Sequence, residues 1–589
     1  MISRNPRRAA IDQAPRRMSA PLSRASSPID VRPPHDTLVA AFEAAARAHA
    51  PFVTIHGGRE PLTLTSEAAL DSSYRWAKLL ASRGVGAGDR VLVLLPTSHA
   101  FVEAMLGTML LGAVPVPLAT PMTFGSVDRY LMNLAAIATD CGARGTITYG
   151  RIRAALESNP ALGAPLGEVM SEGDLDGVGS ICMKLPSIGG SDPAFIQYTS
   201  GTTGAPKGAV ISHRALVSNT FAISSGLSLS DRDVGVSWLP LFHDMGLIGV
   251  LLTSICHPYP IHVMSPESFV MNPRRWLDLV AKVGGTLSAA PNFAYDMTCA
   301  RAGDVADLRL DTWRHALNGA EPIQMTSVAR FTERFAPNGF RSDAPLPVYG
   351  MAEATLAVTF PSLASKMQTL EVARDALEGE RRAVPLPGGH PAVSVGYPVA
   401  GMRIEVVAED GRVVPERTIG DIRVAGPSLM DGYFGNDEAS AAAISGGWLR
   451  TGDLGFIDGG RLFVTGRAKD LIIKGGRNVY PYDVERVAGE VEGVRQGGVA
   501  AFGRTNVATG TEDLVVIVET PHGDAERREV IAKAVRAELL SVLGIKPDEI
   551  RLCGVGKVPR TTSGKIRRRE CARLFAEGML GSAQELHDR

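Results

Sequence analysis

The residues with the clearest chemical purpose form a short loop that begins at Thr199 and ends at Gly208. The loop combines four hydroxyl side chains, three glycines and one lysine. Hydroxyl groups, backbone N–H groups exposed by glycine and an ammonium group all suit the oxygens of a polyphosphate. We therefore predict that the loop binds phosphate through Thr199, Ser200, Gly201, Thr202, Thr203, Gly204 and Lys207.

This loop differs from the Walker A loop of nucleotide hydrolases. Its lysine, Lys207, follows a proline and precedes a glycine, and apolar runs at 194–198 and 209–211 predict a strand on each side. A Walker A loop would instead lead into a helix. A Gly/Thr hairpin without a ligand would explain the glycines, but it would not explain four hydroxyls together with a lysine.

The elements that must position the loop have the pattern of an α/β protein. Helix-like stretches at 38–48 and 101–111 alternate with short apolar runs such as 90–95, which Gly, Asp and Pro flank. After 466–470 the pattern changes, and short strands at 471–473 and 514–518 surround one amphipathic helix. We therefore expect a large domain over 36–466, a hinge over 467–470 and a small α+β domain over 471–589.

The amphipathic helix of the small domain has clear ends. Asp524 can cap its N-terminus and Gly544 can end it. The helical period places four apolar residues on one face, which we expect to be buried: Ile531, Val535, Leu539 and Val542.

Composition excludes several classes of function. The chain has 589 residues, 45% hydrophobic and 21% charged, which is enough for two or three packed units. Lys and Arg number 61 against 62 Asp and Glu, so no overall field attracts nucleic acid or an anionic membrane. The six cysteines are scattered without a C-x-x-C pair or clustered histidines, so we expect no disulfide framework, no zinc site and a cytoplasmic location.

Two apolar stretches and the N-terminus need separate interpretation. The stretches 101–118 and 235–256 contain prolines and charged residues, so we expect core or pocket lining and no stable membrane insertion. Residues 1–35 are rich in Arg, Pro and Ser and are predicted to be a disordered tail. A targeting segment and a misassigned start codon are the alternatives, although the tail lacks the apolar stretch of a secretory signal.

The stretch 198–208 resembles the signature loop of the adenylate-forming superfamily, which includes acyl-CoA synthetases, peptide-synthetase adenylation domains, luciferases and fatty acyl-AMP ligases. Further motifs occur in the family's order from about Leu38 onward. The resemblance implies an α/β fold: a large N-terminal domain of sheets packed with helices plus a distorted barrel, and a small mobile α+β C-terminal domain. It also implies that ATP and Mg²⁺ are the cofactors.

Family motifs imply roles for the nucleotide-binding residues. Tyr349 would stack on adenine, Thr355 would contact the α-phosphate, and Glu353 would help to hold magnesium, for which a carboxylate is a suitable ligand. Asp453 would accept both ribose hydroxyls. The remaining implied nucleotide contacts are Asn318, Gly319, Ala320, Glu321, Gly350, Met351 and Arg467.

Two positions near the C-terminus complete the resemblance. Lys469 matches the hinge motif, and Lys565 matches the terminal lysine that enters the site during adenylation. Without the resemblance, other interpretations stay open for three of these motifs. The 318–322 segment could be a helix-capping turn, Glu353 a solvated loop carboxylate, and the 560–569 run a basic surface tail.

The segment 238–249 resembles the acyl-pocket motif of fatty acyl-AMP ligases, and its aromatic and aliphatic side chains suit an alkyl tail. Phe242 stands where many such ligases have tyrosine, so a hydroxyl-dependent contact is in doubt. His243 is a candidate catalytic gate, with a structural core histidine as the alternative. The implied substrate-binding residues are Trp238, Phe242, His243, Asp244, Met245 and Gly246.

These residues could support the attack of a fatty-acid carboxylate on ATP, which gives acyl-AMP and pyrophosphate, with Thr199, His243, Glu353 and Lys565 as catalytic candidates. A long stretch at 356–394 resembles the insertion of fatty acyl-AMP ligases, which is thought to disfavour CoA, and 477–481 resembles their version of the segment after the hinge. The acceptor implied is a stand-alone acyl carrier protein of a polyketide or peptide synthase. A long-chain acyl-CoA synthetase and a non-catalytic nucleotide-binding relative are the alternatives, and the long stretch could also be a plain loop.

Overall fold

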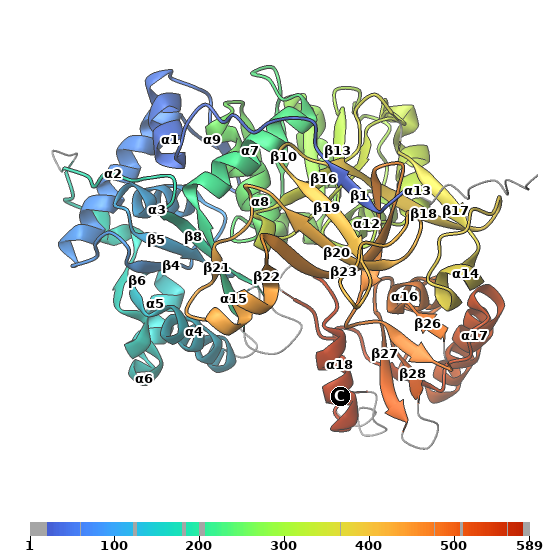
Figure 1. The fold of residues 1–589 in the computed structure, drawn as a ribbon. Coiled ribbons are helices and arrows are strands. Elements are labelled where there is room, and N and C mark those ends of the chain that lie inside the picture. Colours follow the sequence, from blue (N-terminus) through green and yellow to red (C-terminus); the bar gives the residue numbers. More distant parts are fainter. Residues whose placement is uncertain are drawn as a thin grey trace, which may run out of the picture.

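Two mostly parallel sheets form the first part of the protein in a computed structural model (Figure 1). The structure describes residues 21–58, 60–121, 127–179, 184–199, 206–365, 367–475, 477–506, 511–561 and 564–580. The smaller sheet has the strand order β5-β4-β6-β7. Its strands are β4 (Arg90–Val93), β5 (Val114–Pro117), β6 (Ala143–Ile147) and β7 (Glu168–Met170).

The larger sheet has seven strands in the order β14-β13-β12-β10-β11-β2-β3, and only its edge strand β3 runs antiparallel. Strands of such sheets are covered on both faces and are therefore apolar. These strands are β2 (Val53–His56), β3 (Leu62–Leu64), β10 (Gly235–Ser237), β11 (Ile261–Met264), β12 (Leu287–Ala290), β13 (His315–Asn318) and β14 (Pro345–Pro347).

Helices connect and cover these sheets. They are α1 (Leu38–Arg47), α2 (Ser66–Ser82), α3 (His99–Leu110), α4 (Val127–Cys141), α5 (Gly150–Glu157), α6 (Pro160–Gly163), α7 (His213–Leu227), α8 (Asp244–Gly246), α9 (Thr253–Cys256), α10 (Pro266–Met271), α11 (Arg274–Val283), α12 (Asn292–Arg301) and α13 (Met325–Phe335). The stretch 101–118 lies buried in α3 and β5, which confirms that it belongs to the core. Among the residues described, no helix has both the length and the apolar character needed to cross a bilayer.

An antiparallel sheet of ten strands follows, with the main order β1-β19-β20-β23-β24-β18-β16-β15. This order is an open path through the described hydrogen bonds. Its strands are β1 (Arg24–Ser26), β15 (Tyr349–Gly350), β16 (Ala357–Phe360), β17 (Thr369–Val372), β18 (His390–Pro398), β19 (Arg403–Val407), β20 (Gly420–Ala425), β22 (Ile444–Ser445), β23 (Trp448–Asp458) and β24 (Arg461–Arg467). Helices α14 (Arg374–Gly379) and α15 (Asp437–Ala443) interrupt this run of strands.

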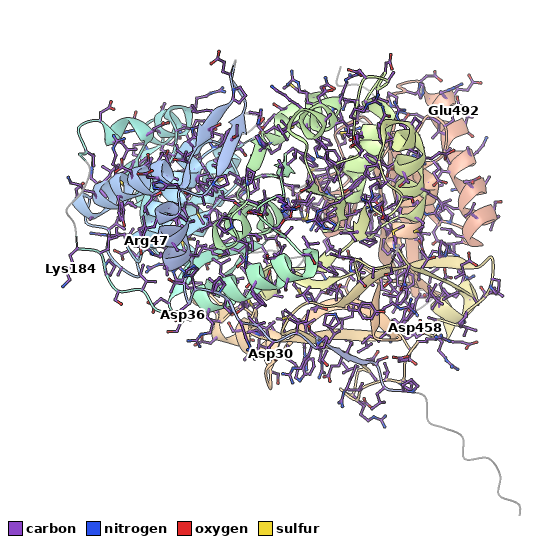
Figure 2. The ribbon with its side chains drawn as sticks, turned by 90° about the horizontal axis from the view of Figure 1, so that it is seen from above. Asp30, Asp36, Arg47, Lys184, Asp458 and Glu492 are labelled. Atoms are coloured by element: carbon purple, nitrogen blue, oxygen red, sulfur yellow. The ribbon has the colours of Figure 1, made fainter. Side chains whose placement is uncertain are left out.

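Residues 21–35 are ordered along one face, which corrects the prediction that the whole of 1–35 is disordered; residues 1–20 lie outside the described part. Strand β1 pairs antiparallel with the sheet edge β19, and Gly401 donates its N–H to Ile29 O over 3.0 Å. From there the segment runs past Asp30 and Asp36 to α1 (Figure 2). Pairing with an open sheet edge satisfies the backbone, so the polar composition did not prevent order.

The C-terminal region, residues 471–580, lies below the ten-stranded sheet in the view of Figure 1. A hairpin and a three-stranded sheet of order β27-β28-β29 pack against helices, as the prediction of an α+β unit requires. The elements are β25 (Ile472–Lys474), β26 (Arg477–Val479), α16 (Pro481–Gly489), β27 (Val499–Asn506), β28 (Thr511–Glu519), α17 (Ala525–Leu543), β29 (Glu549–Cys553) and α18 (Arg568–Ala576). The mixed α/β fold class is confirmed.

The predicted amphipathic helix is α17, with Asp524 and Gly544 as its caps. Ile531, Val535 and Leu539 are buried as expected. Val542 is 46% exposed, and Leu543 is buried in its place. The buried residues follow an i, i+4 row, and such a row is inclined to the helix axis, so the buried stripe ends at Leu543 instead of returning to Val542.

Two adjacent leucines of α17 test this assignment. We expect Leu539→Ala, which removes a fully buried side chain, to lower the free energy of unfolding of the C-terminal region by about 2–5 kcal/mol. Leu540→Ala, at a 53% exposed position, should change it by less than about 0.5 kcal/mol. Urea unfolding of both variants measures the contrast, and equal effects would contradict the placement of the helix.

Candidate active site

The phosphate loop joins two antiparallel strands, β8 (Pro193–Thr199) and β9 (Lys207–Ser212), which confirms that a strand follows the loop. Thr199 and Lys207 face each other across the hairpin. A Cβ at Gly208 would come within 2.6 Å of Ile196, so only glycine fits beneath that side chain. The loop residues Ser200, Gly201, Thr202, Thr203 and Gly204 lie outside the described part of the chain.

Tyr433 connects the phosphate loop with Glu353. It belongs to β21 (Gly432–Tyr433), which pairs with β9, and Lys207 Nζ lies 5.1 Å from the centre of its ring. The Tyr433 hydroxyl donates to Glu353 Oε1 over 3.0 Å, and Met430 N donates to the Glu353 carbonyl over 2.9 Å. No motif found in the sequence includes Tyr433. Only the pairing of β21 with β9 brings it near Lys207 and Glu353, which are distant in sequence.

Glu353 has the chemistry of a magnesium ligand in a nucleotide site. It is a carboxylate held in place by a neighbouring hydroxyl, as ligands of metal ions commonly are. In the part of the chain that is described, no cluster of three or more His, Cys, Asp or Glu side chains could hold a metal ion alone. A magnesium ion beside Glu353 would thus take most of its ligands from phosphate oxygens and water, which is its usual preference.

Thr355 does not lie where the resemblance implied. Its side chain is fully buried, and its hydroxyl donates to Ser428 O over 2.7 Å. Its φ of 63° turns the backbone between the 352–354 turn and β16. Thr355 therefore fixes this turn and has no surface with which to contact a phosphate, and the residue just before Glu353 is Ala352, which has no hydroxyl.

Asp453 lies at the centre of a three-residue cluster. Tyr349 donates its hydroxyl to Asp453 Oδ2 over 2.7 Å, and Arg467 Nε lies 3.0 Å from Asp453 Oδ1. The pairing of β23 with β24 places Asp453 directly opposite Arg467. Burial and the Asp453 charge raise the pKa of Tyr349 well above its ordinary value, so the phenol stays protonated. Each carboxylate oxygen retains a lone pair that could accept a ribose hydroxyl.

The segment after β13 has the close-packed backbone that a flat base would need. A Cβ at Gly319 would lie 2.7 Å from Val348, and Ala320 has a φ of 69°. Asn318 donates its amide to Asn292 Oδ1 over 3.1 Å, while its own Oδ1 is buried without a partner among the described residues. Such an orphaned acceptor fits the amino group of an adenine. At Gly350, next to Met351, a Cβ would meet Leu356 O at 2.0 Å.

Glu321 points away from that backbone toward the C-terminal region. Its Oε1 accepts the N–H of Phe293 over 2.6 Å. Burial raises the pKa of Glu321 to about 6, although the Phe293 N–H and the charge of Lys565 both oppose the rise. Phe293 was not identified by the motif analysis.

The predicted acyl segment joins an aromatic core cluster and ends in a charged pair. Trp238 is buried and stacks on Phe269 with ring centres 3.9 Å apart. The ring centres of Trp238 and Phe293 are 6.2 Å apart. Phe242 uses its backbone carbonyl, which accepts from Gln197 over 3.0 Å, so this contact needs no tyrosine hydroxyl. Met245 is buried, and a Cβ at Gly246 would meet Pro240 O at 2.3 Å.

His243 pairs with Asp244 and is not enclosed in the core. His243 Nδ1 lies 2.7 Å from Asp244 Oδ1, and the two side chains are 21% and 16% exposed. Burial alone would raise the pKa of Asp244, but His243, Lys565 and the N–H of Met245 outweigh burial and lower it. Asp244 is therefore an ionised carboxylate within electrostatic reach of Lys565.

Lys565 reaches this site from the C-terminal region. Its backbone is fixed by a hydrogen bond from Lys565 N to Thr561 Oγ1 of 3.0 Å, and Gly564 packs near the ring of Phe293. Burial lowers the pKa of the Lys565 ammonium below its ordinary value, while the charges of Asp244, Glu321 and Asp453 oppose that shift. The charges that act on Lys565 thus come from three separate segments of the large N-terminal part, and Arg467 adds a positive charge that lowers its pKa further.

The predicted hinge is an exposed turn that ends in an ion pair. Asp470 N donates to Arg467 O over 3.1 Å, and the side chain of Lys469 is exposed. Arg568 Nη1 lies 2.9 Å from Asp470 Oδ2 and Arg568 Nη2 lies 2.7 Å from Glu485 Oε2. An ion pair thus joins the turn to Arg568, three residues after Lys565 in the C-terminal region.

The long stretch 356–394 is structured and touches the C-terminal region, so it is not a plain loop. It contains β16, β17, α14 and the start of β18. The buried Glu378 lies 2.6 Å from Arg477, and Asn478 donates to Glu378 O over 2.8 Å. Arg374 lies 3.5 Å from Asp483.

This fold and site define an enzyme that forms adenylates, and comparison with known proteins gives the family. Residues 42–434 match the AMP-binding enzyme family, so the chain belongs to that family. It is 35% identical over 528 residues to a putative acyl-CoA synthetase of Caulobacter vibrioides, covering 87% of this chain and 90% of the relative.

Two further similarities are informative. The chain is 32% identical over 547 residues to the medium-chain-fatty-acid–[acyl-carrier-protein] ligase JamA of Moorena producens, covering 89% of this chain and 92% of that relative. It also aligns with a solved structure from a study of fatty acyl-adenylate ligases of E. coli and L. pneumophila. That alignment has a TM-score of 0.85 and 35% identity, and it covers 94% of this chain and 99% of the other.

The raised pKa of Glu321 gives a test of the site's electrostatics. The folded protein keeps the proton on Glu321 up to about pH 6, whereas an unshifted glutamate loses it near pH 4.5. The folded state binds more protons in this window, so its stability falls as pH rises. We expect Glu321→Gln to gain about 1 kcal/mol in unfolding free energy relative to wild type between pH 5 and pH 7.5.

Urea unfolding at the two pH values measures this difference. Glu157→Gln, at a side chain that is 70% exposed, serves as the control and should show no such change. A pH-independent difference between Glu321→Gln and wild type would show that Glu321 is not buried as described.

Proposed function

We propose that the protein activates a fatty acid with ATP, forming acyl-AMP and releasing pyrophosphate. The observation that carries this proposal is the position of Lys565, whose ammonium interacts with Asp244 of the acyl segment, Glu321 of the adenine-side segment and Asp453. Burying charged groups costs free energy unless they pair with each other or with a ligand. This position supports an arrangement in which a site for an acid and a site for a nucleotide would adjoin at one lysine.

In the proposed reaction a carboxylate oxygen of the acid forms a bond to the α-phosphorus of ATP, and the bond to the pyrophosphate oxygen breaks. Lys565 would hold the carboxylate and an α-phosphate oxygen together, and Lys207 with Thr199 would bind the departing phosphates. Asp453 and Arg467 would hold the ribose, and Tyr349 the base. Magnesium bound near Glu353 would offset charge on the phosphates.

The apolar part of the site supports a fatty acid as the substrate. Trp238 and Met245 are buried in one aromatic and aliphatic cluster with Phe269, and Phe293 packs against that cluster. The partly buried Phe293 leaves apolar surface at the edge of this cluster, which would gain from burying an alkyl chain. The aligned solved structure comes from a study of fatty acyl-adenylate ligases, which agrees with this choice.

Lys565 gives the direct test of the activation step. We expect Lys565→Ala to slow ATP–pyrophosphate exchange with a fatty acid by about a hundredfold or more, because one preorganised charge donor is lost. ATP binding, measured by calorimetry, should stay within about threefold, since Asp453 and the phosphate loop remain. The control is Lys557→Ala, an exposed lysine of the same region, which should exchange at the wild-type rate.

Unchanged exchange in Lys565→Ala would remove this lysine from the reaction. Absence of exchange in the wild-type protein, with every fatty acid offered, would instead favour a non-catalytic nucleotide-binding relative.

We further propose that the acyl group passes to the thiol of a separate acyl carrier protein, that 36–466 and 471–589 act as two domains joined at the Lys469 turn, and that the reaction occurs in the cytoplasm. The contacts of Glu378 and Arg374 with Arg477, Asn478 and Asp483 support a restrained C-terminal domain. A restraint of this kind is what the resemblance links to poor use of CoA. The name of the JamA relative points the same way, whereas that of the Caulobacter relative supports the alternative, an acyl-CoA synthetase.

A direct comparison of acceptors decides between these two. With ATP, Mg²⁺ and a series of fatty acids, we expect acyl transfer to a phosphopantetheine-loaded carrier protein to exceed transfer to CoA by at least about tenfold. Mass spectrometry of the acylated carrier protein and chromatography of acyl-CoA measure the two products. Comparable rates with CoA would make the protein an acyl-CoA synthetase.

A further inference from the structure

Tyr482 joins the C-terminal region to the nucleotide side of the site through two hydrogen bonds. It is the second residue of α16, directly after the hinge and the β25–β26 hairpin. Its hydroxyl donates to Pro322 O over 2.7 Å and accepts from Gln324 Nε2 over 2.7 Å. One oxygen therefore satisfies a backbone acceptor and a side-chain donor on the same short segment.

That segment is the one that carries Glu321. Tyr482 contacts the carbonyl of Pro322, the residue directly after Glu321, and the charge of Glu321 acts on both Tyr482 and Lys565. Phe293 lies beside Gly564 and donates its N–H to Glu321. Tyr482 of α16 and Lys565 both belong to the C-terminal region. The distance between α16 and the 318–324 segment therefore affects where Lys565 and its neighbour Gly564 lie relative to Phe293.

Other polar contacts connect α16 elsewhere: Glu485 pairs with Arg568 within the C-terminal region, and Asp483 leads to α14. Asp483 pairs with Arg374 of α14, and Arg477 of the preceding hairpin pairs with Glu378 of the same helix. Those contacts restrain the C-terminal region from the side of α14. Among the described residues, the hydrogen bonds that join α16 to the 318–324 segment are the two of Tyr482.

We propose that Tyr482 is a positioning residue that holds the C-terminal region in the orientation presenting Lys565 to the reacting acid. This inference rests on the proposed function. It has a consequence that a purely structural tyrosine would not have. The two bonds favour the activation step and oppose any reorientation of the C-terminal region for transfer, so their loss affects the two half-reactions in opposite directions.

Tyr482→Phe removes the hydroxyl and keeps the ring. We expect the rate of ATP–pyrophosphate exchange to fall about three- to tenfold, the loss expected for breaking partly exposed hydrogen bonds. KM for ATP should stay within about twofold, because no nucleotide contact is removed. Transfer from preformed acyl-AMP to the carrier protein should be unchanged or faster. The matched control is Tyr74→Phe in α2, which removes a partly buried hydroxyl that donates to Glu43 over 3.5 Å.

A double-mutant cycle tests whether the effect acts through Gln324. Gln324→Met removes the side-chain donor but keeps the backbone N–H that bonds Asn292 over 3.1 Å. We expect the rate of ATP–pyrophosphate exchange in the double variant to be no lower than in Tyr482→Phe alone. Both substitutions remove the same hydrogen bond between residues 482 and 324, so their effects should not add. Fully multiplicative losses would show that the two residues act independently, and this would overturn the proposal.

Hydrogen exchange gives a readout that does not depend on activity. In Tyr482→Phe, the backbone amide hydrogens of peptides that cover 318–324 and Lys565 should exchange with solvent faster than in wild type. The amide hydrogens of α17 should keep their wild-type exchange rates. If only α16 loses protection, or if both half-reactions fall together, Tyr482 is a structural residue. If wild-type protein forms no acyl-AMP, the proposed function fails, but the exchange pattern still tests the connection.

Discussion

A buried ammonium must find negative charge, and this requirement links the parts of the protein. Lys565 comes from the C-terminal region, yet the charges of Asp244, Glu321 and Asp453, which belong to the large N-terminal part, act on its ammonium. No two of these residues adjoin in sequence. The sheets and the C-terminal region must therefore be arranged together for the lysine to be stable where it lies. The same arrangement leaves the lysine beside both the nucleotide side and the acyl side of the site.

The backbone supports this arrangement by close approach. Gly319 and Gly350 lie where a Cβ would collide with neighbouring chain, and Thr355 holds a left-handed turn. Tyr349 of β15, next to Gly350, contacts Asp453. The aromatic residues serve as connectors, because Tyr433 links the phosphate lysine to Glu353 and Phe293 lies between Trp238 and Gly564.

Much of this could be predicted from the sequence, because local chemistry decides it. The strands of the phosphate hairpin and the capped helix α17 lie where period and caps indicate. Asp453 and Lys565 came from the resemblance to family motifs, and their roles stay predictions. Tyr433 and Tyr482 were missed because their partners are distant along the chain. Thr355 and Val542 were misjudged for a related reason: a motif and a helical period do not reveal which neighbour covers a side chain. Residues 21–35 are ordered by a sheet edge that composition cannot show.

The most direct measurement is a crystal structure of the protein with a stable acyl-AMP analogue. We expect the ribose hydroxyls to lie within hydrogen-bond distance of Asp453, with the phosphate between Lys565 and the loop that begins at Thr199. We also expect the alkyl chain to lie against Trp238. A nucleotide found elsewhere, or one that contacts Asp453 with the loop on the opposite side of the molecule, would contradict it.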